Sequence, residues 1–94
     1  MTITDETRVS VPAEILVQDL AGESVLLNLN SGHYFGLDEV GTRFWSVLAT
    51  SPTVAAACET LVAEYDVEPE CLRQDLDTLI EQLVEHQLVQ LKDA

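Results

Sequence analysis

The sequence predicts an α+β domain of the winged helix-turn-helix type, in which a three-stranded antiparallel β-meander precedes three α-helices. Apolar residues alternate with a period of two in the first third of the chain and recur at three- and four-residue steps afterwards. Turn-forming residues separate the segments, and 94 residues allow one domain rather than two. We expect that domain to span residues 9–94. Residues 1–8 carry no apolar period and predict a flexible N-terminal tail.

Three segments in the front third are typical of short strands, namely residues 15–20, 24–29 and 33–37. Residues 21–23 form a turn signal after the first segment, and Asn30-Ser31-Gly32 form another after the second. In the middle segment, Val25, Leu27 and Leu29 point to one face, and Leu26 and Asn28 point to the other. Because such short turns join antiparallel neighbours, the three segments predict a β-meander.

The pattern then changes to that of amphipathic helices. Asp38 is the expected N-cap of the first helix, which ends at Ser51 because the residue before a proline avoids the helical region. A second helix begins near Val54. Pro69 suits the first turn of a third helix, where its missing N–H does no harm. Apolar residues at helical spacing form the buried face of this third helix: Leu72, Leu76, Leu79, Ile80 and Leu83.

Two short apolar segments lie near the ends of the domain. Val9 and Val11 alternate with Ser10 and predict a short strand that Pro12 interrupts. Residues 88–91 fit either a last helical turn or a short closing strand.

The charge excludes two classes of partner. Seventeen acidic residues stand against four basic ones, for a net charge of −13, and the four cations are scattered along the chain. Binding of nucleic-acid phosphates needs clustered cations, and an anionic membrane surface would repel this chain. We therefore expect neither nucleic acid nor membrane as a partner. No apolar run is long enough to span a bilayer, and the polar N-terminus is not a secretory signal, so a cytoplasmic location is expected.

Catalytic and metal-binding chemistry have little support in the sequence. His33 and His86 are far apart, and no nucleophile–base set is recognisable. Cys58 and Cys71 fall in predicted helices and are expected as free, core-flanking thiols, with a disulfide as the alternative. We expect His86 to cap the end of the third helix. Metal-ligand spacings such as Cys-x-x-Cys do not occur. The sequence thus predicts no enzyme, no metal and no cofactor.

Peptide recognition at a sheet edge is the remaining possibility. An edge strand has unpaired backbone groups that accept an extended peptide as an extra strand. The segment His33–Leu37 is the best candidate, because Gly36 lets a partner backbone come close. Tyr34 and Phe35 are adjacent, so one of them faces away from the main core and needs cover from a helix or a partner. Both could equally be structural residues of a thin sheet.

The stretch VLLNLNSGHYFGLDEVGTRFW (Val25–Trp45) resembles the PqqD-like family, with its apolar strand, "NL", glycine turn, "YFGL", acidic residue and "VG". The stretch EYDVEPECLRQDLDTLIEQLVEHQLV (Glu64–Val89) resembles the closing segment of the same family. Together the resemblance covers about residues 10–91. The sequence departs from the pattern at His86-Gln87, where a glycine often precedes the last apolar pair.

This resemblance implies a non-catalytic, winged helix-turn-helix recognition element for ribosomally made, post-translationally modified peptides. In such domains the leader segment of a precursor peptide adds beside the third strand and packs against the third helix. Asp75 either bonds to the leader or is a solvated surface carboxylate. The implied peptide-binding residues are His33, Tyr34, Phe35, Gly36 and Leu37 on the strand and Cys71, Leu72, Asp75, Leu76 and Leu79 on the helix.

The aromatic strand is more similar to the stand-alone members that serve lasso-peptide pathways, where a separate leader-cleaving cysteine protease acts before a cyclase. Two alternatives stay open: a peptide chaperone of the pyrroloquinoline quinone type for a radical SAM enzyme, and an acidic winged-helix transcription regulator, which the charge disfavours. An unfilled edge strand also allows an edge-strand homodimer.

Overall fold

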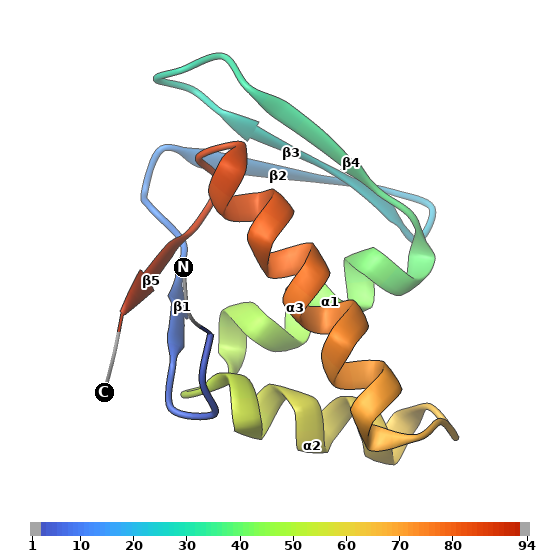
Figure 1. Ribbon diagram of the computed structural model, residues 1–94. Coiled ribbons are helices and arrows are strands. Elements are labelled where there is room, and N and C mark those ends of the chain that lie inside the picture. The colour runs from blue at the N-terminus through green and yellow to red at the C-terminus, as the bar shows by residue number, and fades with distance from the viewer. Residues whose placement is uncertain (1–2, 93–94) are drawn as a thin grey trace.

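The computed structural model describes residues 3–92, which form five strands and three helices (Figure 1). Strands β2, β3 and β4 form an antiparallel sheet in that order, and β1 pairs with β5 in a separate ribbon. The predicted α+β class, with a three-stranded meander before three helices, is confirmed. In chain order the elements are β1 (Arg8–Ser10), β2 (Ile15–Leu20), β3 (Glu23–Asn28), β4 (Tyr34–Leu37), α1 (Glu39–Thr50), α2 (Val54–Glu64), α3 (Pro69–Glu85) and β5 (Gln90–Lys92).

The helices begin where the sequence predicts, because each start has a local cause. The Asp38 carboxylate accepts a hydrogen bond from the Gly41 amide at 2.7 Å, and the Thr53 hydroxyl accepts one from the Ala56 amide at 3.1 Å. Pro69 occupies the first turn of α3. Within residues 3–92, no helix has both the length and the apolar character that a bilayer crossing requires.

The N-terminal segment differs from its prediction. The expected flexible tail of residues 1–8 is wrong for residues 3–8, whereas Met1 and Thr2 lie outside the described residues. The first amides of a helix need acceptors, and this segment supplies them to α2. The Val54 amide donates to the Thr7 carbonyl at 2.8 Å, and the Ala55 amide donates to the Asp5 carbonyl at 3.0 Å.

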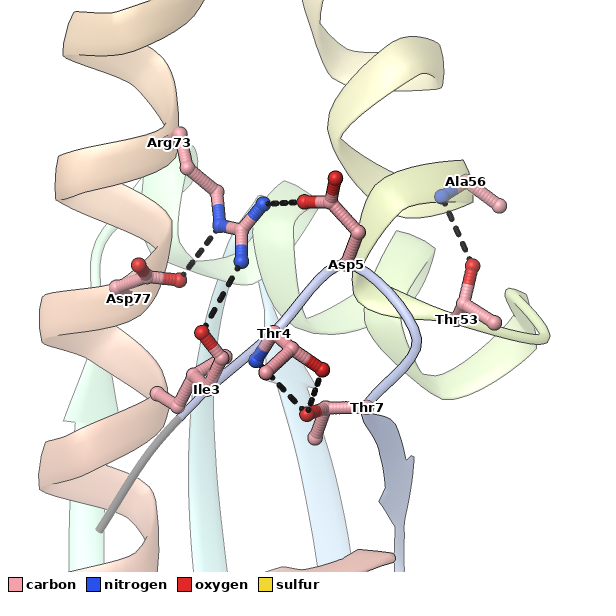
Figure 2. Close-up of polar contacts among 8 residues, drawn as sticks. All are labelled: Ile3, Thr4, Asp5, Thr7, Thr53, Ala56, Arg73 and Asp77. Atoms are coloured by element: carbon pink, nitrogen blue, oxygen red, sulfur yellow. Dashed lines mark hydrogen bonds and ion pairs between the residues drawn. The ribbon is translucent and has the colours of Figure 1, made fainter. Parts of the chain in front are cut away.

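Arg73 on α3 holds the same segment from the other side (Figure 2). Its guanidinium donates to the Asp5 carboxylate and to the Ile3 carbonyl, and it also pairs with Asp77 one turn further along α3. The N-terminal segment therefore packs between α2 and α3. At the other end of the chain, the closing-strand alternative is the one that forms, as β5 pairs with the predicted strand around Val9.

The core lies between the inner face of the sheet and the three helices. Leu26 and Leu37 come from the sheet, and Phe44, Trp45 and Leu61 come from α1 and α2. The predicted buried face of α3 is confirmed in full: Leu72, Leu76, Leu79, Ile80 and Leu83.

The end of α3 explains the departure at His86-Gln87. Gln87 has a φ of 62°, in the left-handed region that favours glycine. Its amide donates to the Val84 carbonyl at 3.0 Å, and the next amide, of Leu88, donates to the Leu83 carbonyl at 2.9 Å. These two bonds form a Schellman motif, with glutamine in the position usually occupied by glycine.

Asn28, the last residue of β3, joins the sheet to this helix end. Its side-chain NH₂ donates to the Gln87 carbonyl at 2.6 Å, and its Oδ1 accepts from the Asn30 and Ser31 amides at 2.9 and 3.0 Å. The side chain is buried, so these bonds are shielded from water. One polar side chain thereby sets both the β3–β4 turn and the position of the turn against α3.

We expect Gln87→Gly to raise the free energy of unfolding by about 1 kcal/mol, because a Cβ in the left-handed region costs about 1–2 kcal/mol. Urea denaturation measures this change. The control is Gln74→Gly in the exposed interior of α3, which should lower stability by about 1 kcal/mol. A loss of stability in Gln87→Gly would contradict the assignment of the helix end.

Asn28→Asp keeps the two acceptor bonds but places a carboxylate oxygen against the Gln87 carbonyl. We expect the free energy of unfolding to fall by at least about 2 kcal/mol, since a buried carbonyl loses its donor and meets a negative charge. Asn30→Asp, two residues further on and exposed, should change stability by less than about 0.5 kcal/mol. Equal denaturation midpoints for the two variants would show that Asn28 has no such role.

Candidate functional site

The open margin of β4 is the centre of the candidate site. Within residues 3–92, no strand pairs with the outer side of β4. The Asn28 amide donates to the His33 carbonyl at 2.8 Å, and in an antiparallel pair hydrogen-bonded residues alternate with residues that point away. The N–H and C=O groups of Tyr34 and Gly36 are therefore directed outward. They are the backbone groups that an added strand could bond.

His86 shows which side of α3 faces β4. Its ring packs edge-on against the ring of Phe35, with 5.0 Å between the centroids, and its carbonyl lies 3.3 Å from His33 Nδ1. Residues at three- and four-position steps before it share the same flank of the helix. We call the flank that continues from His86 by helical spacing the β4-facing flank of α3. It comprises Cys71, Asp75, Leu79, Gln82 and His86, and its described contact with β4 is that of His86.

Both histidines bond through Nδ1 to a carbonyl oxygen. His86 Nδ1 lies 2.9 Å from the Gln82 carbonyl in the last turn of α3, which confirms the predicted capping role. Since a carbonyl oxygen only accepts, each ring carries its proton on Nδ1 in these bonds. The His33 bond thus connects the start of β4 to the end of α3, while the His86 bond stays within the last turn of α3.

The two adjacent aromatic residues of β4, Tyr34 and Phe35, point to opposite faces of the sheet, as strand alternation requires. Phe35 is half-buried against the core, whereas Tyr34 projects from the opposite face and is 72% exposed. Beside it, a Cβ built on Gly36 would meet no atom within 4 Å, so the missing side chain leaves open space. Of the two interpretations of this pair, the structural one therefore holds for Phe35, while Tyr34 remains uncovered.

The leucines expected in the peptide groove are core residues. Leu37, Leu72, Leu76 and Leu79 are buried, and Leu76 is 0% exposed. Their burial has a simple reason: the most apolar stripe of an amphipathic helix is the part that the fold itself buries. Direct contact of these side chains with a peptide would require α3 to move, and it stays a prediction. The accessible members of the predicted site are His33, Tyr34, Gly36, Cys71 and Asp75.

The cysteines are free thiols in different surroundings. Cys58 flanks the core from α2, as expected, and burial raises its pKa above the usual value. Cys71 was expected to flank the core as well but is exposed on α3. In residues 3–92, no group of His, Cys, Asp and Glu is arranged to hold a metal ion.

Two residues that shape the site were missing from the predicted set. Asn28 positions the β3–β4 turn. The sequence feature that could have identified it is a polar amide side chain on the same strand face as the buried Leu26. Gln82 lies on the β4-facing flank, seven positions after Asp75, a spacing that helical periodicity alone could have revealed.

The outer face of the sheet is apolar, which is unusual for a solvated face. Leu16, Leu27 and Tyr34 lie side by side across the three strands. Leu16 is 50% and Leu20 57% exposed, while the inner face buries the polar Ser24 and Asn28. Apolar patches of this kind mark interaction surfaces. We call the set Leu16, Leu20, Val25, Leu27 and Tyr34 the outer apolar face.

Comparisons with known proteins show that the fold is shared with solved structures. The structure of TbiB1 in complex with the TbiA(beta) leader peptide superposes with a TM-score of 0.79 at 31% identity, over 86% of this chain and 94% of that chain. The structure of lasso peptide synthetase B1 complexed with the leader peptide superposes with a TM-score of 0.75 at 27% identity, over 90% and 98% of the two chains. A search of curated proteins finds no match.

A family model described as coenzyme PQQ synthesis protein D matches residues 23–89. This range contains β3, β4 and all three helices, and hence both the open margin and the β4-facing flank of α3. Because the match covers well over half of the sequence, the chain belongs to the PqqD family.

Proposed function

We propose that this protein is a non-catalytic recognition element for the leader segment of a ribosomally made precursor peptide. It binds the leader by strand addition at β4 and presents it to a lasso-peptide maturation enzyme. The observation that carries the proposal is the open margin of β4, with the outward N–H and C=O groups of Tyr34 and Gly36. Support comes from two similar structures, both of which are complexes with leader peptides.

An added strand would be recognised on both of its faces. Its alternate side chains would lie beside Tyr34 on one face and along the β4-facing flank of α3 on the other, near Asp75 and His86. Backbone bonds supply affinity, and the side-chain contacts supply selectivity. After the cost of ordering the leader, such a contact is consistent with affinity of about 1 μM.

Charge favours a leader with basic residues. The chain has a net charge of −13, and Asp75 lies exposed on the flank that faces β4. Attraction of this kind acts mainly on the association rate and weakens with salt. A cytoplasmic location fits the role, because precursor and ribosome share that compartment.

A non-catalytic role fits the surroundings of Cys58, one of the two free thiols. The raised pKa of Cys58 keeps that thiol protonated at neutral pH, and a thiol is a poor nucleophile beside a thiolate.

The outer apolar face supports a protein partner that acts on the bound leader. Tyr34 belongs to both surfaces, since its backbone lies at the β4 margin and its side chain lies on the outer apolar face. A leader strand beside β4 would extend that face with its own side chains. An enzyme covering it would therefore lie next to the segment it processes, and the leader-cleaving protease is the partner we assign.

The β4 margin is tested with Gly36→Pro. Proline removes the outward N–H without removing a bond to β3, and space for its ring is available. In a calorimetric titration with the precursor peptide encoded beside this chain, we expect at least a tenfold loss of affinity. Val17→Pro makes the same change at the other margin of the sheet and should leave leader affinity unchanged. Wild-type protein that gives no heat and no amide shifts at Tyr34 and Gly36 would refute leader binding.

The partner surface is tested with the double variant Leu16→Lys, Leu20→Lys. We expect leader affinity to stay within twofold of wild type and leader removal by the purified protease to slow at least tenfold, because buried charges oppose docking. The matched control is Val40→Lys, Val67→Lys, in which two other apolar residues, each 48% exposed, receive the same charge. Equal cleavage rates for both double variants would place the enzyme elsewhere.

A further inference from the structure

A second open margin lies along β2, on the opposite side of the sheet from β4 (Figure 1). Within residues 3–92, no strand pairs with its outer side. The Leu29 amide donates to the Glu14 carbonyl at 3.0 Å, and alternation from that pair places the bonds to β3 on every second residue of β2. The N–H and C=O groups of Val17 and Asp19 are therefore directed outward, as those of Tyr34 and Gly36 are on β4.

A groove of about 510 Å³ runs between this margin and α1. Val17 lines it from β2, and its side chain is 40% exposed although it points toward the helices. Trp45, a core residue that is 6% exposed, presents one edge to the groove, and the wall formed by α1 carries the small side chains of Ser46 and Ala49. The small residues leave room for the side chains of one more strand.

The groove is acidic. Asp19 and Glu39 line it, and the Asp19 Oδ1 lies 3.0 Å from the hydroxyl of the buried Ser24. Among the described lining residues the one cation is Arg43, and Glu64 holds its guanidinium through two contacts. The groove thus offers two carboxylates to a basic side chain, whereas a second copy of this chain would bring a further charge of −13.

We propose that the β2 margin is a second strand-addition site, which takes an extended basic segment of a partner protein. The segment bonds the outward backbone groups of Val17 and Asp19. An apolar side chain of the segment packs against Val17 and Trp45, and a Lys or Arg lies against Asp19 and Glu39. Because β3 separates the two margins, this segment and a leader at β4 can be bound at the same time.

The probe is an acetylated and amidated peptide of sequence TKTVTKT, whose lysines and valine share one side of an extended strand. Heteronuclear NMR titration should shift the amides of Val17 and Asp19, with and without saturating leader. The peptide TETVTET, with the opposite charge, should bind at least tenfold more weakly.

Protein variants separate this site from β4. Val17→Pro should lower the affinity for TKTVTKT at least tenfold, while Gly36→Pro should leave that affinity unchanged. These effects are the reverse of those that the two variants have on leader affinity. Retained leader binding shows that Val17→Pro is folded. Asp19→Asn keeps the backbone intact and should weaken the peptide at least threefold, whereas Asp66→Asn, an exposed residue outside the groove, should not.

Three results would overturn the inference. The first is a response to TKTVTKT at Tyr34 and Gly36, or at no residue, in place of Val17 and Asp19. The second is equal affinity for TETVTET or for the Val17→Pro variant. The third is dimerisation through β2 in the absence of peptide, which would assign the margin to a second copy. Leader titration is read separately, so failure here leaves the proposed function standing.

Discussion

The hydrogen bond from the Asn28 side chain to the Gln87 carbonyl connects residues 59 positions apart, and the geometry of the β4 margin depends on it. The same side chain closes the β3–β4 turn through its oxygen, so the hairpin and the end of α3 share one buried polar contact. One residue before Gln87, His86 packs against Phe35. Helical periodicity continues the same flank from His86 back along α3.

Within residues 3–92, the sheet is incomplete on both sides, and the first and last strands, β1 and β5, pair with each other instead. Pro12, which has no N–H, separates β1 from β2, and β1 continues away from the sheet to pair with β5. Neither terminal strand is then available to cover β2 or β4. Open edges invite association between copies, and a charge of −13 opposes it. The acidity thus opposes pairing between copies at the two open margins.

Apolar surface is distributed between the two faces of the sheet against the usual pattern. Two positions on the inner face are polar: Ser24 bonds to Thr42, and Asn28 bonds to the carbonyl of Gln87 at the end of α3. Leucines and Tyr34 lie on the outer face. Polar residues in the interior specify how the sheet sits on the helices. Among the described residues, Leu16, Leu20 and Tyr34 stay exposed on the outer face, and this exposure is the basis of the proposed partner surface.

By itself, the sequence determined the order of the three meander strands and the three helices and the starts of the helices, while the structure type of residues 88–91 stayed open. Periodicity is a local property, and so are the N-cap at Asp38 and the proline in the first turn of α3, so these elements were predictable; the strand predicted over His33–Leu37 forms over Tyr34–Leu37. Alternation required that one of Tyr34 and Phe35 face away from the core, and the structure shows that it is Tyr34. The family's leader-binding role likewise followed from motifs within the sequence.

Tertiary structure decided which apolar residues are buried in the protein's own core. Leu72 and Leu76 have the same pattern whether a peptide or the protein's own core covers them, and only packing distinguishes the two. The links through Asn28 and His86, the N-terminal segment held by Arg73 and the open β2 margin likewise depend on contacts between residues far apart in sequence. Such contacts leave no periodic pattern in the sequence, because they depend on how the helices and strands are placed relative to one another. The local sequence of each element does not fix that placement.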